Sequence, residues 1–198
     1  MPQLTQVFAA IDAANARDPK LEVADGQQQP AALVYGRRMS SKLAAYEPAA
    51  GPALGIAARG QHIQRWTIPR ASFPEGRIGY LTWRKELQRV HARRLAEIMA
   101  TVGFDAAIAE RVGQIVRKER LASDPEVQTL EDIACLVFLE HYLTPFAPTQ
   151  DDEKLSGILA KTWNKMSARA HETVLASPPP QRILDLLATG LAKLKAGK

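Results

Sequence analysis

The sequence has one cysteine, Cys135, among 198 residues, which excludes an intramolecular disulfide and a zinc site built from several cysteines. A reducing cytoplasm is therefore the expected location. No run of about 18–20 apolar residues is present, so we expect no membrane span and no membrane partner. The first residues, MPQLTQVFAAIDAANARDPK, also lack the basic region and apolar core of a secretory signal.

Acidic residues are outnumbered, with 21 Asp and Glu against 26 Lys and Arg, and aromatic residues make up only 6% of the chain. The formal net charge of +5 favours anionic partners such as phosphate-bearing small molecules, nucleotides or RNA, although a plain basic surface would give the same charge. Clustering favours a binding site. The segment from Arg59 to Arg94 holds nine Lys and Arg against two Glu, with two of the four histidines and two of the three tryptophans.

Strand-forming patterns are scarce, whereas Ala and Leu are abundant and apolar residues recur at helical spacing. The predicted helices cover about residues 3–16, 31–46, 53–65, 80–102, 105–120, 125–143, 152–176 and 181–198. We predict an all-α fold without strands: a single-domain helical bundle over residues 1–198, with a basic tail that frays from about residue 190. Asp105 and Asp124 are the expected N-caps of two helices, and Gly103 is the expected C-terminal stop of another.

A long connection, WTIPRASFPEGRIGY, separates two of the central predicted helices. It holds two prolines and two glycines in fifteen residues, and a loop of this length inside a compact domain is usually either functional or disordered. Because this one also carries Trp, Phe and Tyr, we predict that it is ordered.

Two histidines and a carboxylate are candidate metal ligands. His91 lies on the apolar face of the 80–102 helix, and His62 lies near the end of the helix before the loop. Asp132, or its neighbour Glu131, faces inward in an apolar helix, where a carboxylate is costly unless it is paired or bound. His62, His91 and Asp132 could hold Mn, Fe, Ni or Zn inside a bundle. A core histidine, a histidine at a helix C-terminus and a carboxylate paired with arginine would explain the same pattern without a metal.

Arginines in the loop are candidate anion ligands, because helix periodicity does not explain their positions. Arginine binds phosphate in a bidentate manner and keeps its charge, and tryptophan can stack on a base. The predicted substrate- or anion-binding residues are Arg38, Arg65, Arg70, Arg77, Trp66, Trp83 and Lys118. No Walker loop, HExxH motif or nucleophile elbow is present.

Several segments resemble a known family. They are IDAANARDP, YGRRMS, IAARGQHIQRWTIPRASFPEGRIGYLTWR, DPEVQTLEDIACLVFLE and KTWNKMSARAHE. Together they resemble a bacterial and fungal family described only as a domain of unknown function, number 4202, over nearly the whole chain. This resemblance implies no activity.

More distantly, the order of helices and polar residues is similar to the HD superfamily of metal-dependent phosphohydrolases, which are all-α. That resemblance implies metal ligation by His62, His91 and Asp132, with Asp132 or Glu131 as catalytic carboxylate. The sequence departs from the HD pattern at Ile63, where the paired Asp would stand, and at Lys118, where another His is often found. Arginines in YGRRMS stand where the first His belongs. These departures leave either a reduced ligand set or an anion site without metal catalysis.

Two functions are therefore expected. The first is an HD-like metal-dependent phosphohydrolase that acts on a nucleotide or a small phosphoester. The alternative is a non-catalytic nucleotide- or RNA-binding helical module with a basic, aromatic-containing pocket. A helical protein–protein interaction domain is a third possibility, but it leaves the arginine-rich loop unexplained. Substrate and oligomeric state are left open.

Overall fold

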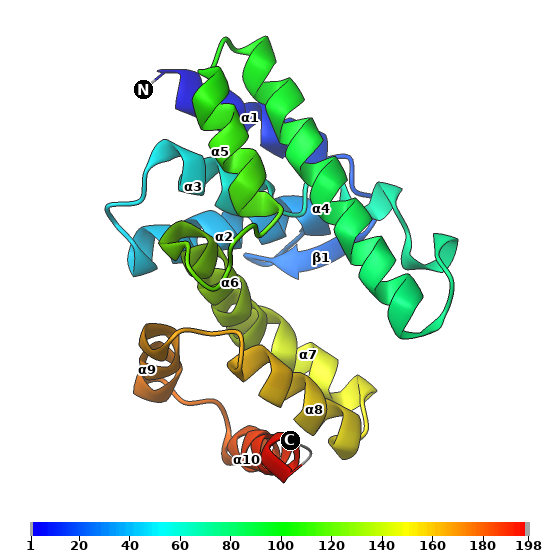
Figure 1. Ribbon diagram of the computed structural model, residues 1–198. Coiled ribbons are helices and arrows are strands. Elements are labelled where there is room, and N and C mark those ends of the chain that lie inside the picture. Colours follow the sequence, from blue (N-terminus) through cyan, green and yellow to red (C-terminus); the bar gives the residue numbers. More distant parts are fainter. Residues whose placement is uncertain (1, 197–198) are drawn as a thin grey trace. The chain divides into compact units, whose positions relative to one another are not determined.

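The computed structural model describes residues 2–196 and contains ten α-helices and one small β-hairpin (Figure 1). The helical prediction is confirmed, and the hairpin is an addition to it. No helix in residues 2–196 is long and apolar enough to cross a membrane.

The hairpin lies between the predicted helices 3–16 and 31–46, where we expected no strands. Strand β1 (Leu21–Ala24) pairs antiparallel with β2 (Gln27–Pro30). The two residues between them, Asp25 and Gly26, have φ values of 52° and 74°. An Asp-Gly pair with positive φ at both positions is typical of a two-residue hairpin turn. The sequence carried this turn signal, but the polar strand QQQP hid the pairing.

The predicted single helical domain is divided into two compact units. The N-terminal unit extends up to Leu130 and the C-terminal unit begins at Glu131. The boundary falls inside helix α6 (Pro125–Val137).

The N-terminal unit contains five helices besides the start of α6. They are α1 (Pro2–Asn15), α2 (Ala31–Tyr46), α3 (Pro52–Gly60), α4 (Gly76–Thr101) and α5 (Ala106–Val116). The long helix α4 packs along α5, and α3 contacts both α2 and α5 (Figure 1). Each helix contributes an apolar stripe to the core, as their spacing predicted. The largest fully buried side chains of this unit include Ile11, Met39, Leu54, Ile56, Leu95, Met99 and Ile115.

The predicted helix ends in this unit are confirmed where capping residues set them. Asp105 Oδ1 accepts hydrogen bonds from the backbone N–H groups of Ala107 and Ile108. Asp124 Oδ1 does the same for the first turn of α6. Gly103 follows α4 with a φ of 66°, the left-handed conformation expected of a C-terminal stop.

The connection between α3 and α4 is ordered, as predicted. It forms two short 3-10 helices, η1 (Arg65–Thr67) and η2 (Arg70–Ser72). Trp83 Nε1 donates to the Ile68 carbonyl at 2.9 Å and Arg94 donates to the Gln64 carbonyl at 3.1 Å, so side chains of α4 hold the loop. Helix α4 begins at Gly76, earlier than the predicted residue 80.

The C-terminal unit contains the rest of α6 and four further α-helices. After α6 come the π-helix η3 (Phe138–Tyr142), α7 (Leu143–Phe146), the 3-10 helix η4 (Ala147–Thr149), α8 (Asp152–Trp163), α9 (Ala168–Ala176) and α10 (Gln181–Ala196). Helices α8 and α10 form the main packing contact. The core of this unit is built from Leu143, Leu155, Leu159 and Ile183.

The helix predicted to run to residue 143 is helical throughout, with π geometry from Phe138 to Tyr142. Two other predicted boundaries in this unit were wrong. The helix predicted over 152–176 is broken after Trp163, because Ser167 caps a new helix by accepting a hydrogen bond from the Ala170 N–H. The tail expected to fray from residue 190 is helical through Ala196, while residues 197–198 lie outside the described residues.

Candidate functional site

The two predicted histidines lie close together in the N-terminal unit. His62, in the turn after α3, stacks on Tyr35 of α2 with ring centroids 4.5 Å apart and planes 18° apart. The His91 ring of α4 lies 6.1 Å from the His62 ring, centroid to centroid. Gln61 Nε2 donates to the Tyr35 hydroxyl at 2.5 Å, which holds the stacked tyrosine.

Burial keeps both imidazoles neutral at pH 7. His91 is 2% exposed, and neither of its ring nitrogens has a hydrogen-bond partner within the described residues. Burial lowers the pKa of His91 to about 3; the charge of Arg65 lowers it further, and the nearby Ile63 carbonyl opposes this. Burial also lowers the pKa of His62, and the neighbouring Arg65, His91, Lys118 and Arg84 side chains lower it further.

The Arg65 guanidinium has no anionic partner among the residues that the structure describes. Its guanidinium lies over the Trp83 ring, 4.6 Å from the centroid, as in a cation–π contact. It forms no ion pair and no side-chain hydrogen bond with any residue that the structure describes. Burial and then the charge of Arg84 lower the pKa of Arg65, but an arginine keeps its charge at neutral pH. We call Tyr35, His62, Arg65, Trp83 and His91 the His62 cluster.

The other predicted anion ligands are distributed differently. Arg38 forms an ion pair with Glu22 of the hairpin at 2.5 Å. Arg70 donates to the carbonyls of Phe73 and Gly76, so it holds the loop.

Arg77 is exposed at the start of α4, and Trp66 is half-buried in η1. Of this set, Arg65 and Trp83 belong to the His62 cluster, and the charge of Lys118 acts on His62.

Sequence reasoning missed Tyr35. It faces His62 because α2 and α3 approach closely at Gly36, where an added Cβ would lie 2.8 Å from the Arg59 carbonyl oxygen. Arg59 is itself held by a bidentate ion pair with Asp12, at 2.7 and 2.6 Å. Gly36 is a signal of close helix packing in the sequence, but the sequence does not show which helix packs against it.

The predicted carboxylates are engaged within the C-terminal unit. Asp132, 2% exposed, accepts hydrogen bonds from the Ser167 N–H at 2.8 Å and the Ser167 hydroxyl at 2.6 Å. Glu131, 4% exposed, lies 3.5 Å from the Lys165 ammonium. Both buried charges therefore have the partners that a buried carboxylate requires.

The three predicted metal ligands are divided between the two units, so the divalent-metal site stays a prediction. Within residues 2–196, no group of three or more His, Cys, Asp or Glu side chains is placed to hold a metal ion. His62 and His91 belong to one unit, where the neighbouring charges of Arg65, Lys118 and Arg84 are positive. Asp132 belongs to the other unit, with both carboxylate oxygens engaged by Ser167. We derive no step through a metal.

Replacing Ser167 with alanine is expected to destabilise the C-terminal unit by roughly 1–2 kcal/mol, since the change removes an N-cap and a donor to a buried carboxylate. Urea unfolding followed by circular dichroism measures the difference. Ser177→Ala is the control, because Ser177 is exposed and its effect should stay below about 0.5 kcal/mol. Equal stability of the two variants would contradict the role assigned to the Asp132–Ser167 pair.

The protein is mostly helical, and its His62 cluster places two neutral histidines near the Arg65 guanidinium, which has no anionic partner among the described residues. The chain belongs to the family described as "Domain of unknown function (DUF4202)", whose model matches residues 5–187. The resemblance to that family is confirmed. No curated protein and no solved structure gives a significant match, so nothing in these comparisons supports the more distant similarity to the HD superfamily.

Proposed function

We propose that this protein binds a phosphate-bearing ligand, a nucleotide or another phosphoester, at the His62 cluster. Arg65 carries the proposal. A partly buried guanidinium without an anionic partner is unfavourable, and a phosphate would supply that partner in the bidentate geometry that arginine favours.

The neighbouring groups suit the same ligand. A neutral imidazole carries one N–H donor, and His91 keeps both ring nitrogens without a hydrogen-bond partner in the described part of the chain. The charges of Lys118 and Arg84, which already act on His62, would attract an anion. The rings of Tyr35 and Trp83 offer flat apolar surfaces of the kind on which bases stack.

Phosphohydrolase activity is the second candidate, and it would use the same binding residues. Its specific support is the pair of adjacent histidines, because imidazole is the most frequent general base in enzymes. The lowered pKa of both rings makes them weak bases, which places this candidate second. Binding is the first candidate because the cluster supplies positive charge for a phosphate. The carboxylates predicted for catalysis, Asp132 and Glu131, are paired with Ser167 and Lys165 in the C-terminal unit.

Calorimetry with AMP and adenosine tests the binding proposal. We expect AMP to bind at least about tenfold more tightly than adenosine, because a charge-assisted contact contributes about 1.5–3 kcal/mol. Arg65→Gln should weaken AMP binding by about tenfold or more and leave adenosine binding unchanged.

The control for this experiment is Arg93→Gln. Arg93 is an exposed arginine of α4 whose nearest carboxylate is Glu97 at 3.6 Å, and its replacement should not change AMP affinity. Phosphate release from AMP in the same samples separates hydrolysis from binding. Equal affinity for AMP and adenosine, or an Arg65→Gln variant that binds AMP as well as the wild type does, would refute the proposal.

A further inference from the structure

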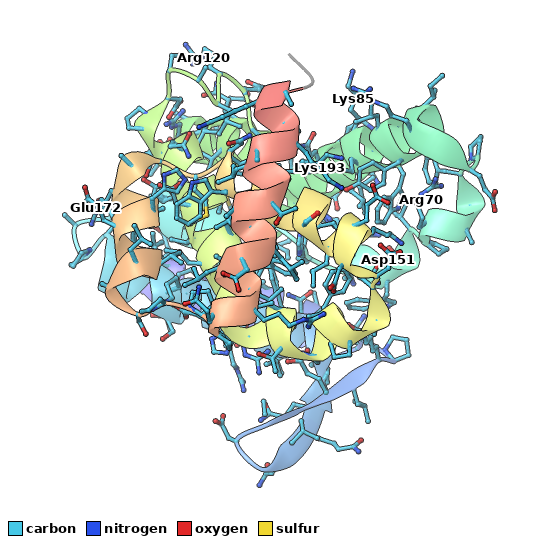
Figure 2. All side chains as sticks on the ribbon, turned by 90° about the horizontal axis from the view of Figure 1, so that it is seen from below. Arg70, Lys85, Arg120, Asp151, Glu172 and Lys193 are labelled. Atoms are coloured by element: carbon cyan, nitrogen blue, oxygen red, sulfur yellow. The ribbon has the colours of Figure 1, made fainter. Side chains whose placement is uncertain are left out.

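The first turns of α4 expose apolar side chains next to unpaired cations. Ile78, Tyr80 and Leu81 are 83%, 43% and 47% exposed. Arg77 and Lys85 lie beside them in sequence, and neither forms an ion pair with any described residue. Figure 2 shows Lys85 projecting away from α4. We call Arg77, Ile78, Tyr80, Leu81 and Lys85 the outer patch.

Local packing explains why these apolar residues face outward. An added Cβ at Gly79 would overlap the Pro74 carbonyl oxygen, so the first turn of α4 is pressed against the preceding loop at a residue without a side chain. Gly79 is buried while Gly76, with a φ of 81°, turns the chain into the helix. The side chains on either side of Gly79 are thereby directed away from the loop.

The outer patch is continuous with the His62 cluster. The Tyr80 and Trp83 rings are 5.9 Å apart, centroid to centroid, and Trp83 carries the Arg65 guanidinium on its face. The Arg84 guanidinium lies 5.9 Å from the centre of the Tyr80 ring. A ligand whose phosphate contacts Arg65 would therefore lie next to the Trp83 and Tyr80 rings and the Arg84 guanidinium of α4.

We infer that the ligand of the His62 cluster is the phosphorylated end of a single-stranded nucleic acid, whose next nucleotides lie on the outer patch. This inference rests on the proposed function. Flat apolar surface beside unpaired cations is the combination that single strands require, because bases stack on the former and phosphates pair with the latter. An acidic peptide or an anionic membrane would use the cations, but neither accounts for the link from Tyr80 through Trp83 to Arg65.

The test compares AMP with 5′-phosphorylated hexa-adenylate by competition in fluorescence anisotropy, using the full chain. We expect the hexamer to bind at least tenfold more tightly than AMP. Tyr80→Ala and, separately, Ile78→Ser should remove most of that gain while AMP affinity stays within twofold. Replacing Arg77 and Lys85 together with glutamine should reduce the slope of log affinity against log salt by roughly 0.7 for each phosphate that the two cations neutralise.

The outcomes separate this inference from the proposed function. If AMP does not bind, the proposed function fails and the inference fails with it. If AMP binds but the hexamer binds no more tightly, or Tyr80→Ala and Ile78→Ser leave the gain intact, only the inference is overturned. Equal competition by heparin would indicate charge alone, and binding to phosphatidylserine vesicles that is abolished in Ile78→Ser without any hexamer gain would indicate a membrane; either result overturns the inference.

Discussion

Lowering the pH from 7 to 5 is expected to destabilise the N-terminal unit through His91. Burial lowers the pKa of His91 to about 3 in the folded state, whereas the unfolded chain has an ordinary value of about 6.5. The unfolded state therefore binds more protons below pH 6.5, and stability falls as the pH falls. For His91 alone, the unfolding equilibrium constant should rise roughly 25-fold, about 2 kcal/mol, between pH 7 and pH 5.

The range of this loss is set by the two pKa values. It begins near pH 6.5 and levels off near pH 3, and His62, whose pKa is also lowered, adds a loss of the same sign. The Asp124 carboxylate does not interfere above pH 5. Its pKa is lowered to about 2 by the hydrogen bond from Arg111, so its contribution is lost only in stronger acid.

Urea unfolding at pH 5, 6 and 7 measures this effect in the wild type and in His91→Leu. Leucine has a similar volume and no proton to bind, so the variant should lose the larger part of the pH dependence. It should fold at pH 7, because replacing polar atoms that lack hydrogen bonds with apolar ones is close to neutral. His91→Gln provides a second non-titrating variant. If both variants keep the wild-type pH dependence, His91 is not the group responsible.

Gly190→Ala is expected to destabilise the C-terminal unit by roughly 2–3 kcal/mol. Gly190 is buried where α10 crosses α8, and an added Cβ would overlap the Ser156 carbonyl oxygen and lie 2.9 Å from the Ala160 Cβ. Because the added Cβ clashes with backbone atoms of α8, one of the two helices must move to remove the overlap. The cost should exceed the gain of about 1 kcal/mol that alanine brings to a helix.

Gly157→Ala provides the matched control. Gly157 lies in α8 of the same helix pair, but an added Cβ there meets no other atom within 4 Å. This variant should gain about 1 kcal/mol, so the two glycine-to-alanine changes should have opposite signs. Urea unfolding gives the two free energies, and hydrogen exchange of α8 and α10 locates the change. An equal effect at both positions would contradict the close approach of the helices at Gly190.

The two experiments also bear on the function in different ways. The histidine pair lies beside Arg65, the cation on which the proposed ligand binding depends. A bound phosphate would favour protonation of the neighbouring imidazoles, so AMP should reduce the acid sensitivity of the wild type. Gly190 lies in the C-terminal unit and is not a member of the His62 cluster.

Local properties of the sequence determined most of the secondary structure. Apolar spacing located the helices, and Asp105, Asp124 and Gly103 marked ends that the structure confirms, because caps depend only on the neighbouring backbone. Errors arose where a competing local signal was read too weakly. Asp25-Gly26 closes a hairpin, and Ser167 starts a new helix where periodicity alone predicted a continuous one.

What each candidate residue does was decided only by tertiary structure. Arg65 and Arg70 lie five residues apart in one basic loop, yet Arg70 holds backbone carbonyls while Arg65 is left without an anion. Asp132 was predicted to be buried, and it is, but its partner Ser167 is 35 residues away. Charge, size and periodicity follow from the residue itself, whereas a partner depends on which distant segment packs against it. The sequence could therefore indicate candidate residues such as His62, Arg65 and His91, but not which of the candidates come together.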